Sequence, residues 1–513
     1  MSAGFIFAIL IAYFLVLIAI SYFTSKGADN QTFFLANRKS PWFLVAFGMI
    51  GASLSGITFI SIPGWPGITN DAGEYVSQFG YMQMVFGYLV GYLVIAFVLM
   101  PIYYRMNLTS IYSYLKERFG TNSHKIGAFY FLLSRVTGAS IRLLLVSNVL
   151  QAFVFEELGI PFEVTVLFSI ILIWVYTFKG GIKTIIWTDT LQTLFMLLSL
   201  GFTFWFLSNE LNLTQSGGLI DSIKSSNYSK ILFVEDWNAK NHFFKMFFGG
   251  IFIAIGMTGL DQDMMQKNLS CKNLKSAQTN MVTFSVLLVF INLIFLALGA
   301  LLFMYASQKG IEIPFEMVEN ELGELVKKNK YDLLFPQIAL KSNIGIGVGV
   351  LFLLGLIAAA YSSADSALTS LTTSVCVDFI DDKEKKATQK QRRTVHVVMS
   401  AVIFVTVLVL NKTLNQNAIM QLITLAGYTY GPLIGLFFFG ILTKKKIKDN
   451  LVYFACLVPP VLSYVINENS KALFDGFQFG ATLIILNALL TFLCLLTIST
   501  PKRTNISIQD EVD

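Results

Sequence analysis

Apolar residues run along this chain in long segments that short polar stretches separate. Thirteen segments come close to or exceed the roughly 20 residues that an α-helix needs to cross a bilayer. Strands of an outer-membrane barrel would instead alternate apolar and polar residues over about ten positions. The pattern predicts an all-α polytopic membrane protein, with spans 1 to 13 at 4–24, 41–67, 76–104, 126–155, 162–178, 184–208, 243–266, 278–306, 346–376, 394–411, 418–442, 450–466 and 478–499.

The basic residues orient these spans. Lys and Arg gather in every second loop, for example at 38–39 and 444–448, and cytoplasmic loops carry such an excess. The alternation predicts an outside N-terminus and an inside C-terminus. Two longer loops, 209–242 and 309–345, fall outside. We expect a short amphipathic helix in the second of them, and another at 109–119 on the inner side.

Composition supports a membrane protein and excludes several functions. Of 513 residues, 55% are hydrophobic and only 13% are charged, whereas an ordinary soluble domain has about 25% charged residues. The net charge of +6 is explained by the basic residues of the cytoplasmic loops. It therefore gives no reason to expect a nucleic-acid partner. The sequence shows no ATP-binding P-loop, no pair of a catalytic nucleophile with a general base, and no cluster of metal ligands. We therefore expect no enzyme, no obligate protein partner, and a multi-pass location in the cell (plasma or inner) membrane.

Span 2 is a poor continuous helix. Its sequence WFLVAFGMIGASLSGITFISIPGWPG is rich in glycine and hydroxyl residues and ends with two prolines, all of which weaken a helix. We expect a break near the middle of the membrane. Backbone carbonyls freed at such a break can coordinate a cation. The alternative is that the small residues only allow close helix packing.

Span 9 carries a face of hydroxyl groups around a carboxylate. Helical spacing brings together Ser362, Asp365, Ser366 and Thr369. Oxygen ligands suit hard cations, so this face is a candidate sodium site. Alternatively, the hydroxyls bond to carbonyls of their own helix.

Ionisable residues also lie within spans 4 and 6. Asp189 is an intramembrane acid and thus a functional candidate, unless it is an interfacial partner of Lys183. Arg135 and Arg142 lie two turns apart in span 4. They are either partners of buried acids or a clamp for a substrate carboxylate.

Six segments resemble the sodium:solute symporter family: FFLANRKSPW (33–42), GASLSGITFISIPG (51–64), GGIKTIIWTDTLQ (180–192), DQDMMQKNLSCKN (261–273), AAAYSSADSALTS (358–370) and GYTYGPLIGLFFFGIL (427–442). They follow the order of the family. The resemblance implies a leucine-transporter-type fold in one transmembrane domain over 1–513. Two inverted five-helix repeats would span 41–208 and 243–442, with peripheral helices at 4–24 and 450–499.

The resemblance also implies binding residues. The principal sodium site would use the carbonyls of Gly51, Leu54 and Ala359 and the hydroxyls of Ser362 and Ser363. A second sodium or proton site would use Asp189, Ser362, Asp365 and Ser366, although several members have Ser where Asp365 stands. By similarity to the sialic acid transporters of the family, the substrate would contact Ser53, Ser55, Thr58, Phe79, Gln83 and an arginine of span 4, which Arg135 matches by residue type. Arg142 joins this set as the second arginine of the possible carboxylate clamp.

Together these features predict a Na⁺-coupled symporter that imports a small carboxylate-bearing solute, such as sialic acid or another organic anion, by alternating access. Na⁺ is the expected cofactor, and the solute and the lipid bilayer are the expected partners. The alternatives are a sodium-independent uniporter, and a sugar, amino acid or vitamin symporter of the same fold. The hydroxyls of Ser362 and Ser363 argue against the uniporter, because a protein that had abandoned sodium would not need them.

Overall fold

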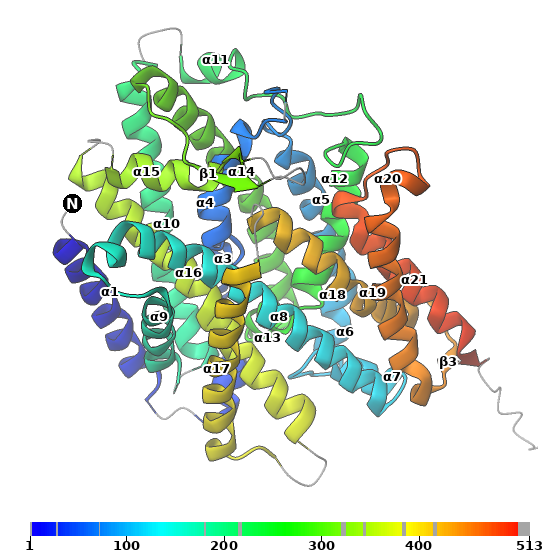
Figure 1. Cartoon of the computed structure of the whole chain (residues 1–513). Coiled ribbons are helices and arrows are strands. Elements are labelled where there is room, and N and C mark those ends of the chain that lie inside the picture. Colours follow the sequence, from blue (N-terminus) through cyan, green and yellow to red (C-terminus); the bar gives the residue numbers. More distant parts are fainter. Residues whose placement is uncertain are drawn as a thin grey trace, which may run out of the picture.

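The computed structural model describes residues 3–26, 29–70, 72–178, 181–213, 218–319, 325–341, 345–381, 386–413 and 418–500. Within these ranges, 10 helices are long and apolar enough to cross a membrane, and two bent pairs of shorter helices raise the number to 12. The shorter apolar helix α9 (Phe162–Thr177) occupies the remaining expected segment. The prediction of an all-α membrane architecture is thus confirmed (Figure 1).

The helices follow the expected segments closely. The first half contains α1 (Ala3–Thr24), α3 (Trp42–Ser53), α4 (Gly56–Gly64), α5 (Tyr81–Val94), α6 (Met100–Arg105), α8 (Thr121–Leu150) and α10 (Ile182–Glu210). The second half contains α12 (Phe243–Ala254), α13 (Gln262–Leu269), α14 (Leu274–Lys309), α16 (Ile346–Ser374), α17 (Gln389–Thr413), α18 (Ala418–Leu442), α19 (Val452–Glu468) and α21 (Leu483–Thr497). The short elements are α2 (Asn30–Leu35), α7 (Ser113–Arg118), α11 (Leu219–Lys224), α15 (Leu334–Lys341), α20 (Ser470–Leu473), β1 (Phe315–Glu319), β2 (Leu325–Asn329), β3 (Lys446–Ile447) and β4 (Ser499–Thr500).

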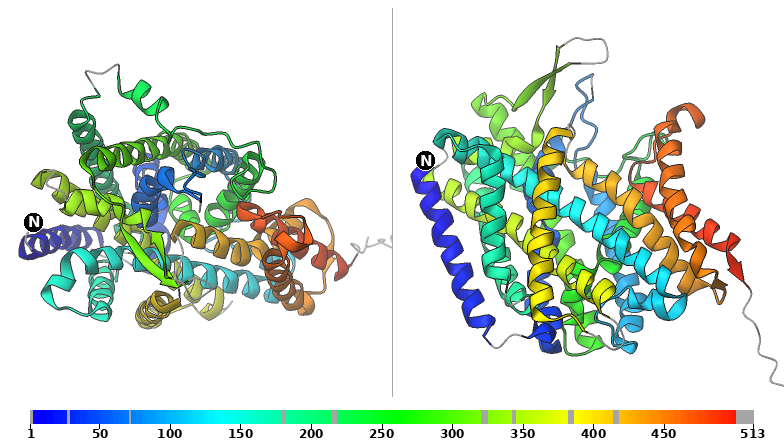
Figure 2. Two further views of the ribbon diagram at one scale, coloured as in Figure 1. Left: turned by 45° about the horizontal axis from the view of Figure 1, so that its top comes forward. Right: turned by 60° about the horizontal axis from the view of Figure 1, so that its bottom comes forward.

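Helix α16 lies in the core, where it packs against α10, α8, α4 and α3. The second half of α16 is fully buried, from Gly355 to Ser374. Helices α1 and α21 lie at opposite edges of the bundle (Figure 2). Small residues allow the central helices to approach closely. A Cβ added at Gly48 of α3, for example, would lie 3.0 Å from the Cβ of Asp189 in α10.

The outer loop 309–345 differs from its prediction. We expected a helix over IPFEMVENELGELVKKN, but its described residues form the antiparallel strands β1 and β2, with Val318 opposite Val326. Exposure alternates along β1, where Phe315 and Met317 are exposed and Glu316 and Val318 are half-buried, and this period of two is typical of a strand. An ion pair of 2.6 Å between Lys330 and Glu316 supports the pairing. On the inner side, the helix expected within 109–119 is confirmed as α7.

Candidate functional site

Two interrupted helices meet in the middle of the bundle. Helices α3 and α4 are bent by 57° at Leu54 and Ser55, which confirms the break predicted in span 2. A second bend of 64° separates the end of α12, with its following π-turn, from α13. Asp261 caps α13 by accepting a hydrogen bond of 2.9 Å from the backbone N–H of Asp263. This second break was not predicted, although Gly256 and Gly259 precede it.

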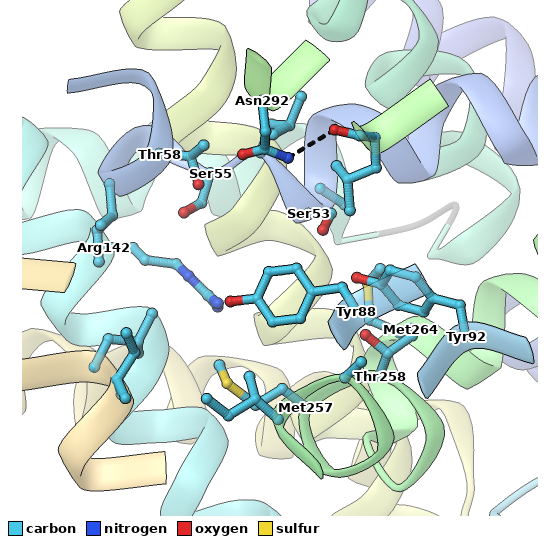
Figure 3. A pocket seen from close by; sticks show the side chains of 18 of the residues that line it. Ser53, Ser55, Thr58, Tyr88, Tyr92, Arg142, Met257, Thr258, Met264 and Asn292 are labelled. Carbon is cyan, nitrogen blue, oxygen red and sulfur yellow. Dashed lines mark hydrogen bonds between the residues drawn. The ribbon is translucent and has the colours of Figure 1, made fainter. Parts of the chain in front are cut away.

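A cavity of about 100 Å³ lies beside these breaks (Figure 3). We call it the central cavity. Five of the seven expected substrate-binding residues line it: Ser53, Ser55, Thr58, Arg135 and Arg142. The remaining lining residues are Ala52, Leu54, Ile57, Tyr81, Tyr88, Tyr92, Ile253, Ala254, Met257, Thr258, Met264, Leu288, Asn292, Leu422 and Ile423. The structure therefore brings most of the expected set together, and its role in binding stays a prediction.

Phe79 and Gln83 are not among the described residues that line the central cavity. The side-chain amide of Gln83 is engaged elsewhere. It donates to the carbonyl of Asn241 at 2.9 Å and accepts from the backbone N–H of Phe233 at 3.0 Å. The backbone N–H of Phe79 donates to the carbonyl of Lys230 at 3.0 Å. Both residues thus anchor the outer loop 209–242 against the start of α5.

Three tyrosines of α5 line the central cavity and were missed in the sequence analysis. Tyr81, Tyr88 and Tyr92 are separated by seven and then four positions, a spacing that places side chains on one face of a helix. The hydroxyls of Tyr81 and Tyr88 lie 3.3 Å apart. On another wall, the Asn292 amide donates to the carbonyl of Leu288 at 2.8 Å (Figure 3). The helical spacing of the tyrosines was the signal that could have found them.

The two arginines of α8 have different surroundings. Arg135 forms a buried ion pair with Asp263 and lies 4.0 Å from Asp261. Asp261 also accepts a hydrogen bond of 2.5 Å from the Tyr430 hydroxyl. Arg142 is only 8% exposed and points into the central cavity (Figure 3). Among the described residues, Arg142 forms no ion pair, and its Nε has no hydrogen-bond partner.

Asp189 is fully buried and has two partners. The Lys267 ammonium of α13 donates to one carboxylate oxygen at 2.7 Å, and the Ser362 hydroxyl donates to the other at 2.6 Å. The alternative pairing of Asp189 with Lys183 is therefore wrong, because the buried ion pair is made with Lys267. Lys267 lies 78 positions from Asp189 in sequence, so helical spacing could not reveal this pair.

The residues expected for the principal sodium site lie on two adjoining elements. Gly51 lies in the last turn of α3 and Leu54 lies at the break itself, and the other members lie on α16. The break abuts α16, because a Cβ added at Gly56 would lie 3.5 Å from the Cα of Ala360. The Ser363 hydroxyl donates to the carbonyl of Ala359 at 3.3 Å. This hydrogen bond within the helix is the one foreseen as the alternative to sodium binding.

The residues expected for the second site fall into two groups. Asp189 and Ser362 interact with each other and with Lys267. Asp365 instead accepts a hydrogen bond of 2.8 Å from the Tyr176 hydroxyl of α9. Its other oxygen and the Ser366 hydroxyl have no hydrogen-bond partner among the described residues. Whether an ion binds in either group stays a prediction.

A family model described as "Sodium:solute symporter family" matches residues 33–449. The chain belongs to this family. It is 26% identical to the sodium/sialic acid symporter NanT of Aliivibrio fischeri over 85% of this chain and 82% of the relative. It is also 26% identical to the sodium/sialic acid symporter SiaT of Proteus mirabilis, over 86% of each chain.

Two solved structures are similar to this fold. A Na⁺-coupled sialic acid symporter, solved in a substrate-bound, outward-open state, aligns with a TM-score of 0.77 at 20% identity, over 96% of this chain and 97% of the other. The nucleobase-cation-symport-1 transporter MHP1 aligns with a TM-score of 0.59 at 15% identity, over 92% and 96%. The chain is therefore a multi-pass sodium:solute symporter and not an enzyme. Na⁺, expected as a cofactor, is a transported co-substrate in such a protein.

Proposed function

We propose that this symporter imports a small carboxylate-bearing solute, sialic acid or another organic anion, together with Na⁺. Arg142 is the observation that carries the proposal. A guanidinium matches a carboxylate with two parallel hydrogen bonds. A buried charge without a counter-ion is costly. Arg142 is buried on the wall of the central cavity, forms no ion pair among the described residues, and has an Nε without a hydrogen-bond partner. A bound anion would supply the missing partner.

The rest of the central cavity suits a solute with one charged end and a mixed polar and apolar body. Hydroxyls of Ser53, Ser55 and Thr258 offer hydrogen bonds, and the rings of Tyr88 and Tyr92 offer flat apolar surface. Aromatic rings pack well against the apolar faces of ligands. Two relatives of the chain are named as sodium/sialic acid symporters, which supports an anionic solute of this kind.

Sodium at the principal site would couple the ion to the solute. Its proposed ligands are the carbonyls of Gly51, Leu54 and Ala359 and the hydroxyls of Ser362 and Ser363. The break between α3 and α4 also lines the central cavity. An ion that joins this break to α16 would therefore order the cavity wall and raise the affinity for the solute, and linkage makes the effect reciprocal.

The proposal includes alternating access between two inverted repeats, 41–208 and 243–442, within thirteen spans that begin outside and end inside. Both proposed repeats begin with a broken helix, with bends of 57° and 64°. Broken helices at the middle of the membrane are typical of transporters that hold ions and solute there. These corresponding breaks support the internal symmetry.

Thermal unfolding of the detergent-purified protein tests the function. A panel of acidic sugars, monocarboxylates and neutral sugars is added in NaCl and, separately, in KCl. We expect a carboxylate to raise the melting temperature in sodium only, because a ligand stabilises the state that binds it. Arg142→Ala should abolish this shift, and Arg142→Lys should retain part of it. Stabilisation by a neutral sugar that survives Arg142→Ala would contradict the proposal.

A further inference from the structure

Helix α13 is buried along its whole length, although it is rich in polar and charged residues. Every residue from Gln262 to Leu269 is shielded from solvent. Met264 lines the central cavity. The Gln262 side chain donates to the carbonyl of Thr109 at 2.7 Å and accepts from the backbone N–H of Ile111 at 3.0 Å. Helix α13 thus lies between the central cavity and the segment that precedes α7, on the proposed inner side of the membrane.

Lys267 is the least expected of these buried side chains. It is only 1% exposed, and an ammonium group is costly to bury unless it is paired. Its partner is the Asp189 carboxylate of α10, at 2.7 Å. The other oxygen of that carboxylate accepts a hydrogen bond of 2.6 Å from the Ser362 hydroxyl of α16. A continuous chain of three side chains therefore joins α16 to α13 through α10.

The first member of this chain, Ser362, is also a proposed ligand of the principal sodium site. A hydroxyl that coordinates a cation through its oxygen directs its hydrogen away from the ion, and here the hydrogen is directed to Asp189. Without the ion, the hydroxyl is free to bond to a carbonyl of its own helix, as Ser363 does. Gly51, another proposed ligand, donates its backbone N–H to the Thr193 hydroxyl of α10 at 3.1 Å. Sodium at this site would therefore hold the Asp189 carboxylate in the position that receives Lys267.

We propose that Lys267 is a positioning residue that couples sodium at the principal site to the closed position of α13. The ion orients Ser362, Ser362 fixes Asp189, and Asp189 holds α13 against the bundle through Lys267. Loss of the ion weakens this hold, so that α13 moves away more readily and opens the central cavity to the inner side. The inference rests on the sodium-coupled function proposed above, and it adds the route by which the ion acts on the inner side.

A native cysteine reports the position of α13. Cys271 follows this helix and is fully buried, and its carbonyl accepts a hydrogen bond of 3.2 Å from the Tyr104 hydroxyl. The detergent-purified full chain is treated with N-ethylmaleimide in NaCl or in KCl, without solute, and mass spectrometry quantifies the modified Cys271 peptide. We expect alkylation to be about tenfold slower in sodium, a usual size for coupling between two sites.

Substitutions of two buried lysines test the role of Lys267. Lys267→Met should still bind ²²Na⁺ but should lose the difference in alkylation between the two salts, because Asp189 no longer reaches α13. Lys267→Arg keeps the cation and should recover most of the difference. Lys245→Met is the matched control. Lys245 is a buried lysine of α12, but it donates to the carbonyls of Asn238 and Gln478, so its loss should leave the protection of the cysteine by sodium intact.

The outcomes separate this inference from the proposed function. Binding of ²²Na⁺ with protection of Cys271 that persists in Lys267→Met would overturn the inference but keep the symporter, as would an equal loss of protection in Lys245→Met. Absence of ²²Na⁺ binding in the wild type would overturn the proposed function itself. Should Lys267→Met fail to fold, the double variant Asp189→Asn/Lys267→Met removes both charges, a change that buried pairs often tolerate. Protection by sodium that survives in the double variant would also overturn the inference.

Discussion

Arg135 and Arg142 lie two turns apart on α8, but they have different partners. Arg135 is neutralised by Asp263, so it ties α8 to α13 at the wall of the central cavity. Arg142 faces the cavity, with no ion pair among the described residues. The structure thus gives Arg135 the first of the two roles considered, that of partner to a buried acid. The second role, as the clamp for a solute carboxylate, is the one proposed for Arg142.

This division predicts opposite effects on stability. Arg135→Gln should lower the free energy of unfolding by about 3–5 kcal/mol, because it leaves the Asp263 carboxylate buried without its cation. Arg142→Gln should leave the melting temperature unchanged or raise it, because it removes a buried charge that forms no ion pair among the described residues. The measurement is thermal unfolding in detergent without solute. Equal losses in the two variants would argue against separate roles.

The sequence pattern indicated that these charged residues lie in the membrane, but it could not show which of them form ion pairs with each other. Arg135 and Asp263 are separated by 128 positions, and Asp189 and Lys267 by 78. Helical periodicity connects residues three or four positions apart and says nothing about contacts between distant helices. Spacing thus indicated which residues are candidates, and the packing of α8, α10 and α13 determined their partners.

At the scale of elements, α4 depends on close contact with α14. Gly299 of α14 faces Pro63, and a Cβ at this glycine would lie 3.0 Å from the Cα of Pro63. The contact is with backbone, which cannot rotate away as a side chain can. Because α4 carries Thr58 of the central cavity, this contact helps to position the cavity wall.

Gly299→Ala should therefore destabilise the protein by about 1–3 kcal/mol, the usual cost of overpacking, and should weaken the binding of the stabilising solute. Gly201→Ala in α10 is the control. Nothing lies within 4 Å of its added Cβ, and alanine is the better helix former. Its melting temperature should be equal to or above that of the wild type. A loss of stability in Gly201→Ala as large as in Gly299→Ala would show that steric contact is not the cause.

Local composition explains which elements could be predicted. The break in span 2 followed from glycines, hydroxyl residues and prolines within one segment. The break before α13 depends on the capping of a new helix by Asp261, and the prediction gave that carboxylate no such role. Strands β1 and β2 depend on pairing with each other, whereas the sequence pattern was interpreted as helical. Elements that depend on tertiary partners were thus the ones missed.

At the scale of the whole molecule, the number of ions determines the response to voltage. Two sodium ions with one monovalent anion carry one net positive charge inward in each cycle, and 100 mV of potential then contributes ~2.3 kcal/mol. Uptake of the stabilising carboxylate into proteoliposomes should accelerate when the interior is made negative. The second site that the family resemblance implies includes Asp365. Asp365→Asn should therefore transport one sodium ion per anion, so that uptake still requires sodium but no longer responds to potential. Voltage-dependent uptake that persists in Asp365→Asn would mean that the second charge enters elsewhere.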